Sequence, residues 1–184
     1  MKRVALELGG SALNVILDDA DVDHAVRATV VGRYLRQGQV CMSNNRIIVD
    51  AKVYDEFVDR FTAHVKSLKY GDPNDREVAI GPIINQKQLK AHLEHIEGAR
   101  AAGARQAVGG DPEGVLPPHV FVDARNDMQI AQDEMFGPIV PIIKVNDEAE
   151  ALRVANDTQY WLSSAVFTRT GSGASGLCCK FRLA

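Results

Sequence analysis

The sequence predicts an α/β protein in which an open, mainly parallel, twisted sheet carries helices on both faces. Short runs of apolar, often β-branched residues alternate with amphipathic helix patterns, as in βαβ units. The chain has 184 residues, of which 46% are hydrophobic, and this is enough for one domain with its own core. Its three cysteines are too few, and odd in number, for a disulfide framework, which favours a reducing compartment.

Short apolar runs are expected to form the strands of this sheet. The first two lie on either side of Gly9-Gly10, a turn signal. Pro141 lies inside the longest run, and a proline within a strand indicates an edge position or a bulge. The expected strands cover residues 4–8, 14–17, 46–49, 107–108, 119–122, 139–145 and 163–167.

Four segments have the apolar periodicity of amphipathic helices. Asp21 is a suitable N-cap for the first, and apolar residues recur every fourth position from Val53 to Val65 in the second. The expected helices cover about 21–37, 53–68, 86–102 and 147–155. Because helices separate most of the strands, those strands should run parallel and be covered on both faces.

Charge and hydropathy exclude several classes of partner. The net charge is −3, from 21 basic and 24 acidic residues, so we expect no nucleic-acid or anionic-membrane partner. No apolar run approaches the length of a membrane helix, and Glu7 and two glycines interrupt the only apolar stretch near the start. We therefore expect a cytoplasmic protein without a secretory signal.

Cys41 and Glu7 are the candidate catalytic residues. Cys41 follows an expected helix and precedes an expected strand, where a cysteine can be exposed beside backbone amides that bind an oxyanion; the alternative is a buried small hydrophobe. Glu7 lies in the apolar run Val-Ala-Leu-Glu-Leu, where desolvation would raise the pKa of its carboxyl toward that of a general base. The alternative is an edge-strand glutamate that faces water. The residues alone do not decide between these interpretations.

Glu134 and Phe136 are candidate binding residues. An acid beside an aromatic at the entrance of a strand suits a ribose hydroxyl pair with a ring nearby, although an ordinary loop explains these residues equally well. His92 and His95 lie three residues apart on an expected helix, but no third ligand is evident, so we expect solvated histidines and no metal site.

Three segments taken together resemble signature segments of the aldehyde dehydrogenase superfamily. They are Leu6-Glu7-Leu8-Gly9-Gly10, then Gly38-Gln39-Val40-Cys41 continuing to Arg46, then Glu134-Met135-Phe136-Gly137-Pro138. Their order and spacing fit, with 34 residues from Glu7 to Cys41 and 93 from Cys41 to Glu134. The resemblance covers about residues 4–169, and Ser11 with Cys41-Met42-Ser43 looks most like the benzaldehyde and vanillin dehydrogenase branch.

The resemblance implies a role for each matching residue. Cys41 would attack an aldehyde to give a thiohemiacetal, its backbone amide would donate to the oxyanion, and hydride transfer to NAD or NADP would leave a thioester. Glu7 would activate the water that hydrolyses this thioester. Glu134 would hold the ribose of the nicotinamide half, Phe136 would lie near that half, and Gly9 and Gly10 would border the nicotinamide site. The substrate would be a small aldehyde, for example an aromatic one.

The sequence also departs from the family pattern. The family's full chain is far longer, and its N-terminal coenzyme domain, with the asparagine that supplies a second oxyanion donor, has no match here. Trp161 stands where the family usually has a glycine. We therefore expect that this chain alone does not oxidise aldehydes at a family-like rate. A coenzyme-independent thiol esterase, and a non-catalytic remnant that binds a full-length relative, remain as alternatives, and we expect a homo-oligomer or other self-association.

The last 15 residues differ in style from the rest. Residues 170–184 contain two cations, no acid, three glycines and two of the three cysteines. Their literal G-x-G-x-x-G is followed by too few residues for a dinucleotide-binding unit. We expect residues 1–169 to form an incomplete aldehyde dehydrogenase catalytic domain, and residues 170–184 to be a non-native tail, produced for example by a frameshift.

Overall fold

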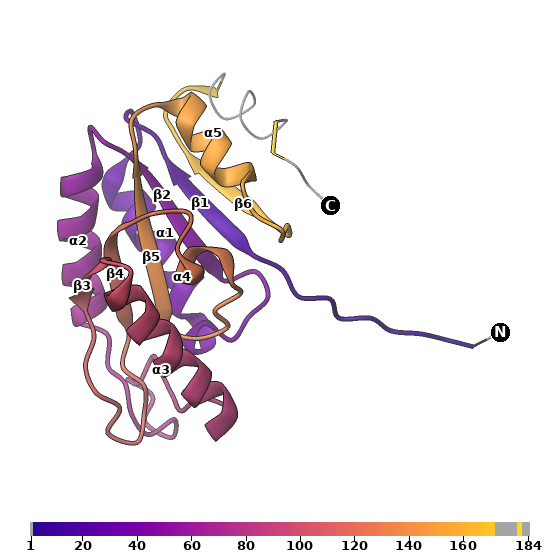
Figure 1. Ribbon diagram of the computed structural model, residues 1–184. Helices are drawn as coiled ribbons and strands as arrows, with labels where there is room; N and C mark the ends of the chain where they lie inside the picture. The colour runs from indigo at the N-terminus through magenta and orange to yellow at the C-terminus, as the bar shows by residue number, and fades with distance from the viewer. Residues whose placement is uncertain (1, 172–179, 182–184) are drawn as a thin grey trace.

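The computed structural model describes residues 2–171 and 180–181, and these form a six-stranded sheet with helices on both faces (Figure 1). The pair β3–β4 is antiparallel, and every other neighbouring pair is parallel. The predicted open, mainly parallel α/β architecture is therefore confirmed. In sheet order the strands are β3 (Arg105–Val108), β4 (His119–Ala124), β5 (Ile139–Val145), β2 (Asn44–Asp50), β1 (Ala12–Ile16) and β6 (Ser164–Phe167).

The helices divide between the two faces of the sheet. One face is covered by α1 (Val22–Tyr34), which continues into a 3₁₀ turn at Leu35–Gly38, and by α2 (Tyr54–Lys66). The other is covered by α3 (Gln86–Ala101), the short α4 (Gln129–Gln132) and α5 (Glu148–Asn156). Asp21 caps α1 as predicted, its Oδ1 accepting from the backbone amide of His24 at 3.0 Å.

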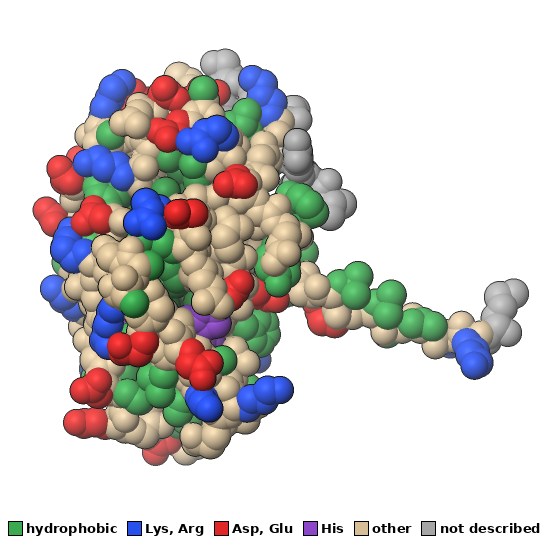
Figure 2. Space-filling view, viewed as in Figure 1, with side chains coloured by type: hydrophobic (Ala, Val, Ile, Leu, Met, Phe, Trp, Pro, Cys, Tyr) green, Lys and Arg blue, Asp and Glu red, His purple; other side chains and the backbone are tan. Residues whose placement is uncertain are grey.

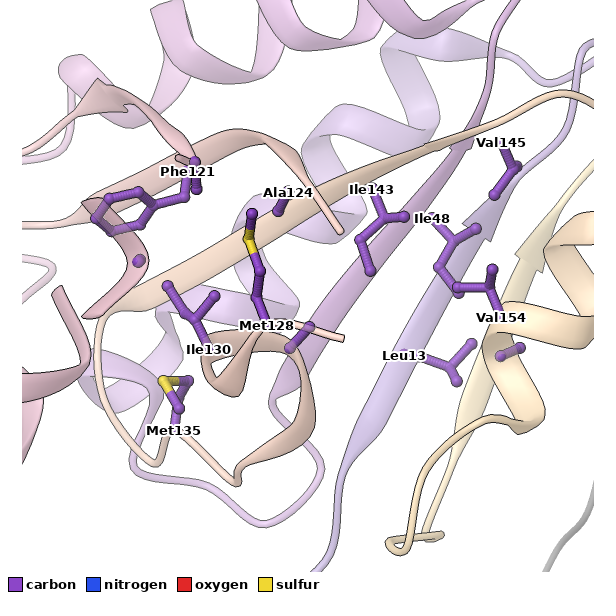
Figure 3. Packing of buried hydrophobic residues seen from close by; sticks show 14 of the residues in the cluster. Leu13, Ile48, Phe121, Ala124, Met128, Ile130, Met135, Ile143, Val145 and Val154 are labelled. Carbon is purple, nitrogen blue, oxygen red and sulfur yellow. The ribbon is translucent and has the colours of Figure 1, made fainter. Parts of the chain in front are cut away.

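Side chains of the central strands alternate between two hydrophobic clusters. Along β2, Ile47 and Val49 pack beneath α1 and α2, whereas Ile48 packs beneath α3, α4 and α5. Figure 3 shows the second cluster, in which Ile48 of β2 lies next to Val154 of α5, and Ile130 of α4 lies near Met128 and Met135. A strand buried on both faces has no polar side, because successive side chains point to opposite faces.

The run at residues 4–8 was predicted to be a strand, and that prediction is wrong. These residues form an extended arm that leaves the body of the molecule (Figure 1). Val4, Leu6 and Leu8 are 74–81% exposed, and no described strand pairs with the arm. Alternating apolar residues become a strand only where a neighbour satisfies the backbone and covers the apolar side chains.

Pro141 does not mark an edge strand, because β5 lies inside the sheet between β4 and β2. Its partner on β4 is Phe121, and the register of β4 against β5 becomes irregular directly after that residue. Regular pairing of β5 with β2 begins only at Ile142. The bulge alternative is thus the one present, and the missing N–H of proline falls where the ladder is already interrupted.

The C-terminal region reaches the core at one described position. Phe181 is 9% exposed and packs in the cluster beneath α5, and the carbonyl of Lys180 accepts from Asn156 Nδ2 at 3.2 Å. Residues 172–179 and 182–184 lie outside the described part of the chain, so the non-native origin of 170–184 stays a prediction. No helix within the described residues is long and apolar enough to cross a membrane.

Candidate active site

The three segments expected to carry the chemistry each precede one of three adjacent parallel strands. Gly9-Gly10 leads into β1, Cys41 into β2, and Glu134 to Phe136 into β5. These strands are neighbours in the order β5-β2-β1 and run in the same direction. Parallel strands begin at one edge of a sheet, so segments far apart in the sequence meet at the amino ends of these strands.

Five of the six predicted site residues line one hollow at this edge. The hollow measures about 410 Å³, and its lining residues are Glu7, Gly9, Cys41, Glu134 and Phe136. The sixth predicted residue, Gly10, is buried next to it, and its backbone N–H donates to the carboxylate of Glu134. A thiol, two carboxylates and an aromatic ring therefore surround one space.

The loop that carries Cys41 contains a tight turn, and its first residue packs against the backbone of Gly137. The backbone N–H of Ser43 donates to the carbonyl of Val40 at 2.9 Å, which places Cys41 within the turn, where it is exposed. Gly38 enters the loop at φ +76°, and a Cβ there would lie 2.4 Å from the carbonyl oxygen of Gly137. The interpretation of Cys41 as a buried small hydrophobe is therefore wrong.

Glu134 is half-buried, and its environment favours the protonated form. Burial raises the pKa of its carboxyl, and the negative charge of Glu7 raises it further, while the Gly10 amide opposes both. Gly9 has φ +75°, and a Cβ there would lie 2.7 Å from Glu134 Oε2. A side chain at position 9 would therefore close the approach to this carboxylate.

Glu7 is exposed, so the expected desolvation of its carboxyl is not present. Its Oε1 accepts from the Gly9 amide at 3.3 Å. The alternative interpretation, a glutamate that faces water, is the one found, although the residue lies on the extended arm and not in a strand. The reason is that the arm has no packing neighbour that would exclude water from it.

Sequence reasoning missed two buried residues beneath the site. Arg33 is fully buried at the end of α1, and its Nη1 donates to the carbonyl of Asn44 at 3.0 Å and to Asn45 Oδ1 at 3.2 Å. Asn45 Nδ2 donates to the carbonyl of Asp133 at 2.7 Å. The signal was available, because Arg33 lies four residues after Thr29 on the face of α1 that is otherwise buried.

His92 is also buried, so the expectation that it is solvated is wrong. Burial lowers the pKa of its imidazole to about 4, with further contributions from the positive charges of His95 and Arg33. A Cβ at Gly137 would lie 2.3 Å from its Nε2, so α3 packs closely on the segment that carries Glu134. The nearby His95 forms a hydrogen bond between its Nε2 and Asp133 Oδ2, at 3.0 Å. Across the described residues, no three acidic, histidine or cysteine side chains are grouped as metal ligands.

Comparisons with known proteins identify the family of the chain. The model of the aldehyde dehydrogenase family matches residues 1–181. The Bacillus subtilis protein AldY, which carries the name aldehyde dehydrogenase, is 54% identical over 168 residues, covering 91% of this chain and 35% of its own length. Vanillin dehydrogenase of Corynebacterium glutamicum is 49% identical over 170 residues, covering 92% of this chain and 35% of its own.

A solved structure gives the same result. The crystal structure of an NAD-dependent benzaldehyde dehydrogenase from Corynebacterium glutamicum has a TM-score of 0.94 and 45% identity, and the match covers 100% of this chain and 40% of that one. This chain spans about 35% of the length of the curated relatives that it matches. The sequence, the fold and the residues at the amino ends of β1, β2 and β5 together lead to one conclusion: the chain belongs to the aldehyde dehydrogenase family.

Proposed function

We propose that Cys41 is the nucleophile, and Glu7 the general base, of an aldehyde oxidation that passes through a thioester. The observation that carries this proposal is that both side chains, from segments 34 residues apart, line the same hollow as Glu134 and Phe136. A thiolate is both a strong nucleophile and a good leaving group, and water near neutral pH needs a base to attack a thioester.

The proposed reaction uses these residues in sequence. The Cys41 thiolate forms a bond to the aldehyde carbon, and the carbonyl electron pair moves to oxygen, which the backbone N–H of Cys41 stabilises. Loss of a hydride from this thiohemiacetal leaves a thioester on Cys41. Glu7 then removes a proton from water as the water attacks the thioester carbon, and the products are the carboxylic acid and the free thiolate. Exposure of Glu7 suits this last step, because water reaches it directly.

The residues around the hollow fit the nicotinamide half of NAD or NADP. The missing side chain at Gly9 keeps the Glu134 carboxylate open, so Glu134 is able to accept from ribose hydroxyls, while Phe136 offers an apolar wall. When bound, the nicotinamide ring accepts the hydride.

We also propose a substrate class, a cellular location and the steps of the reaction that the 184-residue chain performs by itself. The relatives named for vanillin and benzaldehyde favour a small aromatic aldehyde as the substrate. The charge and the cysteine content favour a cytoplasmic location. Because the chain spans about 35% of its curated relatives, we propose that the 184-residue chain alone carries out the cysteine chemistry without family-like oxidation by NAD(P). Rapid NADH production from benzaldehyde by the purified chain would contradict that part.

An activated ester tests the cysteine chemistry without a coenzyme. We expect p-nitrophenyl benzoate to acylate Cys41, releasing nitrophenolate and adding one benzoyl group to the protein mass. Cys41→Ala should abolish both signals. Glu7→Gln should keep the acylation but slow deacylation by about 100-fold, as is typical for loss of a general base, so that the acyl-protein accumulates.

Glu113→Gln is the matched control, because Glu113 is also exposed but does not line the hollow. It should turn over like the unmodified chain. Equal deacylation rates in the Glu7 and Glu113 variants would remove Glu7 from the mechanism, and acylation that persists in Cys41→Ala would remove Cys41.

Association with another chain is a second candidate function, favoured by the exposed arm. Apolar side chains project along it, away from the body of the molecule (Figure 2), and Val4, Leu6 and Leu8 are 74–81% exposed. Contiguous exposed apolar residues mark interaction sites. We propose self-association, or binding to a full-length relative, through this arm. Replacing all three residues by Ser should shift the sedimentation of the chain toward the monomer, and an unchanged profile would exclude the arm.

A further inference from the structure

Two buried side chains connect two walls of the hollow. One wall is the segment 38–45, which is the loop that carries Cys41 together with the first two residues of β2, and the other is the segment 133–137, which carries Glu134 and Phe136. Arg33 donates to the carbonyl of Gly137 through Nη2, and to the carbonyl of Asn44 through Nη1 at 3.0 Å. A single guanidinium therefore donates hydrogen bonds to both walls.

Asn45 makes the same kind of connection next to this guanidinium. Its Oδ1 accepts from Arg33 Nη1 at 3.2 Å and from the backbone N–H of Met135 at 3.1 Å. Its Nδ2 donates to the carbonyl of Asp133 at 2.7 Å. The carboxamide is thus hydrogen-bonded to the backbone on both sides of Glu134, at Asp133 and at Met135. These bonds fix the backbone from which the Glu134 side chain projects.

The cation in this network has neutral partners. Arg33 is fully buried and makes no ion pair within the described part of the chain. Burial lowers the pKa of its guanidinium to about 10. A desolvated cation is costly unless its donors are bonded, so the carbonyls of both walls are held at fixed positions around it. The planar fork of arginine can reach both walls at once, whereas an ammonium group cannot.

We propose that Arg33 and Asn45 are positioning residues that set the separation of Cys41 from Glu134 and Phe136. The chemical consequence rests on the proposed function, because only there do the thiol and the nicotinamide contacts act on one substrate. The separation of Cys41 from Glu134 and Phe136 can be tested independently, without aldehyde oxidation or ester hydrolysis. Neither side chain lines the hollow, so both act through the backbone of the two walls.

A crosslinking measurement tests this geometry directly. Phe136→Cys places a second thiol on the wall that does not carry Cys41, and Cys178→Ala with Cys179→Ala removes the other two thiols. A short bis-maleimide should then join positions 41 and 136 within one chain. We expect Asn45→Ala to slow this reaction by about 10-fold, because proximity effects fall steeply when two groups are misplaced.

Asn14→Ala is the matched control. Asn14 is buried too, but its Nδ2 bonds Thr29 Oγ1 at 2.9 Å between β1 and α1, away from both walls. It should lose comparable stability in urea and keep the crosslinking rate. Asn45→Asp retains the acceptor bonds to Arg33 and Met135 but loses the donor bond to Asp133, so it should restore part of the rate. Where Asn45→Ala does not fold, Arg33→Lys, which keeps the charge without the fork, should slow crosslinking in its place.

The outcomes separate this inference from the proposed function. Equal crosslinking rates in the Asn45→Ala and Asn14→Ala variants would overturn the positioning role, and so would an Asn45→Asp variant as slow as Asn45→Ala. The crosslinking reagent needs neither an aldehyde nor Glu7. A chain that crosslinks as expected but is not acylated by an ester would therefore contradict the proposed function and leave the positioning role intact.

Discussion

The loop that carries Cys41 and the arm that carries Glu7 line the same hollow, yet they are held in opposite ways. The segment that carries Cys41 is hydrogen-bonded to the buried Arg33 through Asn44 and Asn45, and Gly38 packs against the backbone of Gly137. The arm is exposed from residue 2 to residue 9, and the Glu7 carboxylate bonds only to the nearby Gly9 amide within the described residues. The core of this chain positions the nucleophile, whereas the base has no comparable support.

This difference predicts where substitutions act. Changes beneath the Cys41 loop should alter stability and thiol reactivity together, because the same contacts support both. Changes on the arm should leave the stability of the monomer unchanged, and a change at Glu7 should alter only the step that needs a base.

Gly38→Ala should have the largest effect. The methyl group meets the Gly137 carbonyl at 2.4 Å and the residue must keep φ +76°, so strain and overpacking together should cost about 4 kcal/mol of the free energy of unfolding. Urea denaturation measures this loss, and iodoacetamide labelling should show altered reactivity of Cys41.

Gly103→Ala is the control for the backbone strain alone. Gly103 has φ +91° but no atom within 4 Å of the added methyl group, so the expected loss is about 1 kcal/mol. Similar losses for the two variants would mean that Gly38 is not packed as described.

Acid should destabilise the protein through His92, the next largest effect. The pKa of its imidazole is about 4 when folded and 6.5 as the reference for the unfolded chain, so the unfolded chain binds more protons in this interval. Stability from this group is complete above pH 6.5 and falls as the pH drops to 4, by about 3 kcal/mol in all.

Unfolding free energies of His92→Gln and of the unmodified chain between pH 7 and pH 4 check this. The variant should lose that part of the pH dependence, whereas His64→Gln, at an exposed histidine, should keep it. A slope that survives in His92→Gln would assign the acid sensitivity to other groups.

Glu7→Gln should have the smallest effect on the fold and a specific effect on the site. Because the charge of Glu7 helps to raise the pKa of the Glu134 carboxyl, that pKa should fall in the variant. The free energy of unfolding should change by less than about 0.5 kcal/mol, as for other exposed sites. Carbon NMR titration of Glu134 measures the shift. A pKa that matches the one in Glu113→Gln would place the arm away from Glu134.

Much of the fold could be predicted from local patterns. The period of about four in Val53 to Val65 became α2, and the β-branched runs became strands of the sheet. Residues 4–8 did not, because a pattern of alternating apolar residues does not say whether a neighbour exists to cover them. Pro141 failed as an edge marker for a related reason, since the irregular pairing that accommodates it belongs to β4.

The site could be predicted only as separate segments. Cys41, Glu7 and Glu134 were found through their resemblance to a family, and the chain's topology brings them to one hollow. Arg33, Asn45 and His92 belong to no recognised motif, and their importance comes from burial, which depends on how α1, α3 and the segment 133–137 pack. An arginine on the buried face of a helix was the one local sign of this network.

The position of the hollow at the amino ends of the strands leaves the opposite edge of the sheet free for engineering. The strands β1, β2 and β5 are five to seven residues long, so at about 3.3 Å per residue the turns after them lie some 17–23 Å from the thiol. A fluorescent label at the exposed Lys52 should therefore report on this chain, or tether it to a surface, without obstructing access to Cys41.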